Sequence, residues 1–104
     1  MSPVEPAVLA MTPKRRMEMW KNDPSDPAMP IVILGDGKWI RLNVVGAIIW
    51  ELCTAENTVS RIVDTVATRF PDVGREVIEA DTIAFLEEFD RRRIIVLDYD
   101  PLAP

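Results

Sequence analysis

Apolar residues follow two periods along this chain, one typical of strands before the middle of the sequence and one typical of helices after it. The run 31–34 (IVIL) is apolar and mostly β-branched, which predicts a buried strand. The glycines of 35–37 (GDG) can supply the positive φ angles of a tight hairpin, so the returning strand is predicted over 38–42. Alternation around Met17 and Met19 predicts an earlier short strand.

The first two predicted helices each begin at a capping residue and carry an apolar stripe at helical spacing. Asn43 is a good N-cap for a helix over about 44–53, because its side chain can accept a hydrogen bond from a free N–H of the first turn. Thr58 can cap a second helix over about 59–70, which Pro71 ends.

The third helix is predicted over about 74–92, and its apolar stripe begins at either Val77 or Ile78. A last strand or extended segment follows over 94–97. Three prolines in the segment 22–30 predict a loop, because proline removes a backbone donor. The order of the elements predicts an α+β, winged-helix-like fold in which a small antiparallel sheet of three N-terminal strands packs on three helices.

The length of 104 residues predicts one folded domain with an extension at each end. We expect residues 1–29 to form a loosely ordered N-terminal arm that can include a first strand, and prolines make 1–15 look like a loose tail. Residues 30–97 are expected to form the domain, and residues 98–104 a frayed C-terminal tail.

The net charge of −5 is confined to the predicted domain and its C-terminal extension. Residues 31–104 carry thirteen acids and eight bases, whereas residues 1–30 carry four of each. The third helix holds six acids and one base over 75–90, and such a helix would repel a phosphate backbone. A winged-helix regulator that binds DNA is therefore an alternative that the charge disfavours, and the basic run 91–93 is expected to meet the helix dipole instead.

The composition does not indicate catalytic chemistry. The chain has no His, which excludes His-based nucleophile activation and His metal ligands, and Cys53 is its single cysteine. We expect Cys53 to be a small buried hydrophobe in a protein from a reducing compartment. No apolar run approaches the ~20 residues of a membrane span. The sequence predicts a cytoplasmic, non-catalytic protein without cofactor or metal and without a nucleic-acid or membrane partner.

The strand over 38–42 is the best candidate for a binding element. If Ile40 and Leu42 face the core, Trp39 and Arg41 must face the other way. An exposed Trp on an edge strand favours a peptide that adds as a further strand. Two alternatives stay open at this point: Trp39 covers the N-terminal arm or the first strand, which the residues alone favour about as much as a bound peptide, or the edge strand pairs with a second copy and the protein is a self-pairing dimerisation module.

Three segments, taken together, resemble the PqqD-like family: KWIRLNVVGAIIWEL, TVSRIVDTVATRFPD and VIEADTIAFLEEFDRRRIIVL. The resemblance covers about residues 30–97. The matching positions are Leu42-Asn43, Gly46-Ala47, Trp50-Glu51-Leu52, Thr58, Ile62-Val63, Phe70, Asp81, Phe85-Leu86 and Phe89. The family often has a Gly after its third helix, where this chain has Arg92-Arg93, and the first thirty residues match no part of the pattern.

The resemblance implies recognition of the leader segment of a ribosomally made precursor peptide and its delivery to a modifying enzyme, often of the radical SAM class. In the family, the leader adds beside the third strand and lies against the third helix, and some members dimerise. Transferred to this chain, the peptide-binding residues are Lys38, Trp39, Ile40, Arg41, Leu42, Asp81, Ala84, Phe85 and Glu88. The sequence does not choose among pyrroloquinoline quinone, mycofactocin-like and lasso-type pathways.

Overall fold

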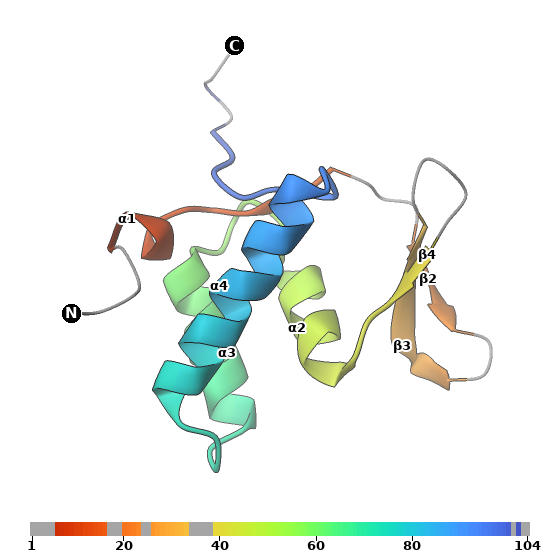
Figure 1. Ribbon diagram of the computed structural model, residues 1–104, viewed down its shortest axis with the longest axis horizontal. Coiled ribbons are helices and arrows are strands. Elements are labelled where there is room, and N and C mark those ends of the chain that lie inside the picture. The colour runs from red at the N-terminus through yellow and green to blue at the C-terminus, as the bar shows by residue number, and fades with distance from the viewer. Residues whose placement is uncertain (1–5, 17–19, 24–25, 34–38, 101, 103–104) are drawn as a thin grey trace.

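A computed structural model describes residues 6–16, 20–23, 26–33, 39–100 and 102 (Figure 1). In chain order the elements are α1 (Pro6–Leu9), β1 (Lys14–Arg15), β2 (Trp20–Asp23), β3 (Asp26–Ile33), β4 (Trp39–Arg41), α2 (Val44–Leu52), α3 (Val59–Arg69), α4 (Arg75–Arg91) and β5 (Ile95–Val96). The mixed α+β class expected from the sequence is confirmed. The winged-helix arrangement stays a prediction.

The strands form two antiparallel sheets. One has the order β2-β3-β4 and stands beside α2, on the right of Figure 1. The other pairs β1 with β5, which lie at opposite ends of the sequence. In the larger sheet Ile31 lies opposite Arg41 and Ile33 opposite Trp39. The hairpin expected between these strands fits this pairing, although the turn and Lys38 lie outside the described residues.

The loop predicted over 22–30 is wrong, because these residues belong largely to β2 and β3. The physical reason lies in the register. Strand β4 pairs with β3 only over 31–33, so the part that contains Pro27 and Pro30 has a strand on one side only. Proline is tolerated in a strand where its missing N–H is not needed for a second ladder.

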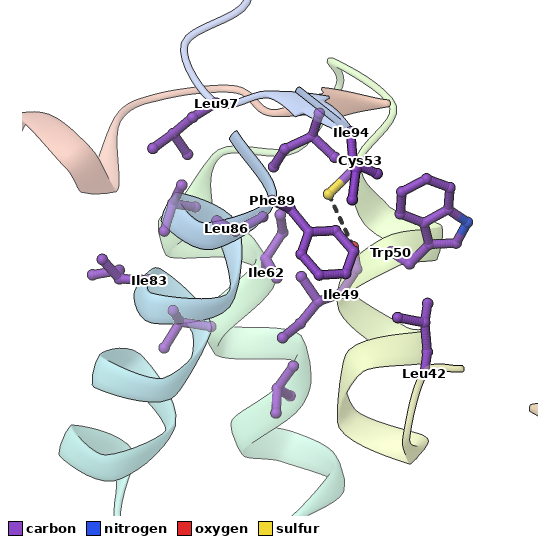
Figure 2. Packing of buried hydrophobic residues seen from close by; sticks show 14 of the residues in the cluster. Leu42, Ile49, Trp50, Cys53, Ile62, Ile83, Leu86, Phe89, Ile94 and Leu97 are labelled. Atoms are coloured by element: carbon purple, nitrogen blue, oxygen red, sulfur yellow. Dashed lines mark hydrogen bonds between the residues drawn. The ribbon is translucent and has the colours of Figure 1, made fainter. Parts of the chain in front are cut away.

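Helices α2, α3 and α4 enclose the core, which Figure 2 shows from close by. Both predicted N-caps are confirmed: Asn43 Oδ1 accepts from the Gly46 N–H at 2.7 Å, and Thr58 Oγ1 accepts from the Arg61 N–H at 3.1 Å. The stripe of α4 begins at Ile78, which is buried, while Val77 is exposed. The rings of Trp50 and Phe89 pack edge to face, with centroids 6.3 Å apart.

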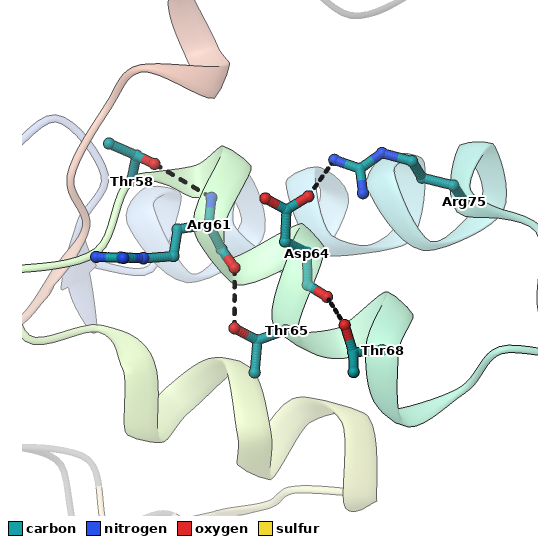
Figure 3. Close-up of polar contacts among 6 residues, drawn as sticks. All are labelled: Thr58, Arg61, Asp64, Thr65, Thr68 and Arg75. Atoms are coloured by element: carbon teal, nitrogen blue, oxygen red, sulfur yellow. Dashed lines mark hydrogen bonds and ion pairs between the residues drawn. The ribbon is translucent and has the colours of Figure 1, made fainter.

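Figure 3 shows polar contacts on the outer surface of α3 and between α3 and α4. The hydroxyls of Thr65 and Thr68 donate to the carbonyls of Arg61 and Asp64, one turn back along α3. Asp64 also forms an ion pair with Arg75 at the start of α4. Both side chains are more than half exposed, so this link between the middle of α3 and the first residue of α4 adds little stability.

The N-terminal segment is more ordered than the loose tail expected over 1–15. Pro13 is fully buried, and its carbonyl accepts from the Ala55 N–H at 3.0 Å. The Met11 carbonyl accepts from the Val59 N–H at 2.9 Å. Prolines removed backbone donors from this segment, but its carbonyl acceptors remain, and the domain supplies the matching N–H groups.

Segments from the N-terminal and C-terminal parts of the chain meet where β1 and β5 pair. The Thr12 hydroxyl donates to the Tyr99 carbonyl at 3.0 Å, and Lys14 Nζ lies 4.6 Å from the centre of the Tyr99 ring. Arg15 turns inward and donates to the Trp50 carbonyl at 3.0 Å. The start of the tail predicted over 98–104 therefore has partners, at least as far as Tyr99.

Helix α4 ends in a Schellman motif. The Ile94 N–H donates to the Phe89 carbonyl at 2.9 Å, and the Arg93 N–H donates to the Asp90 carbonyl at 3.0 Å. Arg93 has φ of 60°, the left-handed conformation that glycine normally occupies at this place. Ile94 and Phe89 are both buried and add the apolar contact that usually accompanies the motif.

Candidate functional site

Strand β4 is an edge of its sheet within the described part of the chain. Its three residues pair with β3 on one side, and none of the described strands pairs with its other side. In a strand, the backbone N–H and C=O groups alternate between the two edges, so the outer edge keeps groups that a further strand can pair with. This is the geometry that an added peptide strand requires.

Side chains of β4 and the next residue alternate as the sequence predicted. Trp39 is 62% exposed and Arg41 is exposed, whereas Ile40 is half-buried against the core and Leu42 is 3% exposed. Because 62% of Trp39 is exposed, the described N-terminal elements leave most of its side chain uncovered. This argues against the alternative in which Trp39 packs over the N-terminal part of the chain. Lys38, the remaining strand residue of the predicted site, lies outside the described residues.

The strand is joined to the helices by a tight contact at the start of α2. A Cβ atom on Gly46 would lie 3.1 Å from Asn43 Oδ1 and 3.1 Å from Cε2 of Phe85. The Phe85 ring of α4 therefore lies against the first turn of α2, close to the end of β4. Glycine at position 46 permits this approach. A Gly inside an apolar helix is itself a sequence signal for close packing by a neighbour.

The remaining predicted residues share one face of α4. Asp81, Ala84 and Glu88 are exposed, and Phe85 is half-buried between them and the core. The Phe85 and Phe89 rings stack with centroids 4.1 Å apart, which anchors this face to the buried aromatic group. The predicted site residues thus divide into a strand set on β4 and a helix set on α4, connected through Phe85 and Gly46.

Charge on this face is partly neutralised at one end. Glu88 forms an ion pair with Arg91, and the hydrogen bond from Arg91 lowers the pKa of the Glu88 carboxyl below its ordinary value. The same contact raises the pKa of Arg91. At the other end of the face, the Asp81 side chain makes no ion pair or hydrogen bond with any residue that the structure describes.

An apolar cavity of about 170 Å³, which was not predicted from the sequence, opens beside Asp81. Its lining residues come from all three core helices and the α3–α4 loop: Val45, Val66, Phe70, Val73, Ile78 and Asp81. Val66 and Phe70 follow the helical spacing of an apolar stripe, and stripe positions that line a cavity have the same periodicity as those that fill a core.

Cys53 lies in the core and does not belong to this site. Burial raises the pKa of its thiol to about 12, although the nearby Arg15 cation acts in the opposite direction. The thiol donates to the Ile49 carbonyl at 3.2 Å (Figure 2). The prediction that Cys53 is a small buried hydrophobe is confirmed.

The described residues offer neither a metal-binding cluster nor a membrane-spanning helix. They contain no group of three or more His, Cys, Asp or Glu residues that could hold a metal ion. None of the helices among them is long and apolar enough to cross a membrane.

These features define a small α+β domain in which a strand edge that no described strand covers lies next to an exposed helix face. The family model described as "Coenzyme PQQ synthesis protein D (PqqD)" matches residues 29–95, which is more than half of the chain. The chain therefore belongs to the PqqD family of precursor peptide recognition elements, and the predicted resemblance is confirmed. No curated protein and no solved structure gave a match.

Members of this family are non-catalytic recognition elements in the biosynthesis of ribosomally synthesised, modified peptides. They bind precursor peptides and associate with the enzymes that modify them. The match ends close to β5 and begins after β1 and β2, so the N-terminal segment that completes the core is outside it.

Proposed function

We propose that this protein binds the leader segment of a precursor peptide as a fourth strand on the outer edge of β4. The observation that carries the proposal is the open edge of β4 with Trp39 62% exposed beside it. Backbone pairing along an edge gives affinity without sequence choice, whereas an exposed aromatic residue beside the edge can act as an anchor. Family membership supports a peptide as the occupant of this edge.

The face of α4 is proposed as the second wall of the binding site. Phe85 supplies an apolar surface that is already fixed by its stacking on Phe89, so little ordering is needed when a peptide arrives. Asp81 and Glu88 border this surface with charge, and Ala84 leaves room between them. Charged groups around an apolar anchor are expected to set the register and the choice of peptide more than the raw affinity.

The partner enzyme is also part of the proposal. We expect the bound leader to be delivered to a peptide-modifying enzyme, often of the radical SAM class in this family, in the cytoplasm. A buried, unpaired Cys53 is compatible with a reducing compartment. This protein itself is proposed to act by binding and presentation, without catalysis or a cofactor.

Calorimetric titration tests the proposal directly. The ligand is a synthetic peptide that covers the N-terminal part of a short precursor encoded beside the gene. Trp39→Ala should weaken its binding by at least about 1 kcal/mol, roughly fivefold, because an aromatic anchor is lost. Leu102→Ala is the matched control, since Leu102 is also an exposed apolar residue but lies near the C-terminus. Equal losses in both variants, or in neither, would remove Trp39 from the site.

The alternatives have separate tests. The exposed acids of α4, among them Glu76, Asp81 and Glu87, disfavour a DNA-binding regulator, and an electrophoretic shift with duplex DNA at low salt would reveal one. Self-pairing of the β4 edge would give a homodimer, which sedimentation at increasing protein concentration would detect. Dimer formation that competes with the peptide would place both at the same edge.

A further inference from the structure

We propose that the cavity beside Asp81 receives an apolar side chain of the bound peptide, and that Asp81 pairs with a Lys or Arg close to it in the peptide. The inference rests on the proposed function and adds a sequence preference to it. An edge strand pairs with any backbone, so choice among peptides has to come from side-chain sites such as this one.

The size and lining of the cavity suit one side chain. Its volume of about 170 Å³ is comparable with cavities of about 150 Å³ whose apolar lining accepts a benzene-sized group. Five of its six lining residues are apolar, and Asp81 is the exception. Val73 lies at its exposed side with 43% of its surface accessible, so the cavity is open to a group that arrives from outside. A branched aliphatic or aromatic side chain meets these conditions.

The charge at the cavity selects a cationic neighbour. Asp81 is exposed and has no ion-pair partner among the described residues, whereas Arg75, the nearest basic residue along α4, already pairs with Asp64. Glu76 and Glu79 on the same helix add negative charge to this end. An incoming Lys or Arg would face no described cation on this part of α4, and an incoming acid would be repelled.

The cavity and the β4 edge are connected along the chain. Val45 lines the cavity, and it follows Leu42 and Asn43, which lead from β4 into the first turn of α2. Phe85, one turn after Asp81 on α4, contacts the same turn at Gly46. A peptide on the β4 edge that continues past Leu42 therefore meets Phe85 first and the cavity next.

A selection from a displayed library of random twelve-residue peptides tests this without knowledge of the natural precursor. The full chain should enrich peptides that carry an apolar residue close to Lys or Arg. Asp81→Lys should enrich Asp or Glu at the basic position instead. Val73→Trp, which places a large ring at the open side of the cavity, should abolish the apolar preference. Glu87→Lys is the control, an exposed acid of α4 outside the cavity that should leave the selected pattern unchanged.

A peptide selected by the unchanged chain is then titrated into each variant, and its binding should fall at least tenfold with Asp81→Lys and not with Glu87→Lys. If all variants select the same peptides, and these protect β4 amides, the inference fails while the proposed function stands. If the full chain enriches no peptide, both fail. If Val73→Trp instead abolishes dimer formation in sedimentation without changing peptide binding, a second copy fills the cavity and the inference is wrong. Asp81 is exposed, so its variant remains informative if Val73→Trp does not fold.

Discussion

At the scale of single residues, the contact between Gly46 and Phe85 determines the relative position of the strand set on β4 and the helix set on α4. An added Cβ at position 46 would be 3.1 Å from the Phe85 ring, closer than ordinary van der Waals contact. The absence of a side chain at Gly46 therefore makes room for one particular neighbour, the Phe85 ring. The sequence indicated close packing at this glycine but could not identify the neighbour. Burial of Leu42 beneath the same turn was predictable from strand alternation alone.

A double-mutant cycle measures this contact. Gly46→Ala in the unchanged chain gains helix propensity of about 1 kcal/mol but crowds Phe85 and Asn43, so its net benefit should be reduced or lost. In a Phe85→Ala background the crowding by the ring is absent, and the same substitution should raise the unfolding free energy more. Urea denaturation of the four proteins gives the coupling. Additive effects would show that Phe85 does not press on this turn.

The Cys53 thiol gives a second prediction at this scale. Its pKa is raised from 9.0 to about 12 by burial, so the native protein holds the proton at pH values where the unfolded chain has lost it. The contribution of the buried, protonated thiol to the free energy of unfolding is fully present below about pH 9, and it is lost as the pH rises toward 12. The unchanged chain should therefore lose stability relative to Cys53→Ala as the pH rises above 9 in urea titrations. Alkylation by iodoacetamide should require unfolding, and rapid labelling of the native protein would contradict the burial.

At the scale of elements, the three core helices were predictable from the sequence, whereas the short helix α1 was not predicted and the strands were predicted only in part. Caps at Asn43 and Thr58 mark helix starts through local hydrogen bonds, which depend on neighbouring residues only. The extent of β3 depends on which strands lie beside it, and its prolines are tolerated because β4 does not reach them. A local signal for a loop was thus overruled by a long-range arrangement that composition does not reveal.

The end of α4 allows a prediction at this scale. Arg93 has a positive φ, and the side chain makes that conformation costly by about 1 kcal/mol. Arg93→Gly should therefore raise the unfolding free energy by about that amount. Arg92 has φ of −83°, so Arg92→Gly should be neutral or destabilising and serves as the matched control. A lower stability for Arg93→Gly would mean that its side chain makes a compensating contact.

At the scale of the whole molecule, the N-terminal segment and the C-terminal strand close the core together. Residues outside the family match, from Met11 to Arg16, donate or accept backbone hydrogen bonds at five other places in the chain: Cys53, Ala55, Val59, Ile94 and Tyr99. The sequence could not predict this, because prolines in an N-terminal extension are equally typical of a loose tail. The cavity was missed for a related reason: its residues are far apart in the sequence.

Truncation tests the role of this segment. Removal of residues 1–16 eliminates buried Pro13 and the hydrogen bonds of β1, and should lower the unfolding free energy by about 3 kcal/mol or more. Removal of residues 1–10 keeps β1 and Pro13 and should cost less. Thermal melts followed by circular dichroism compare the two with the full chain. Equal melting temperatures for all three would mean that the domain folds without the segment.

The central claim is that a peptide adds as a strand to β4, and amide NMR with hydrogen exchange tests it most directly. Labelled protein is titrated with the synthetic leader peptide, and the shifts and protection of individual amides are followed. The account predicts shifts over residues 39–42 and on the Asp81–Glu88 face of α4, with slower exchange of the outward-facing amides of β4. Saturable binding that leaves β4 unshifted and unprotected would contradict the account and place the peptide elsewhere on the molecule.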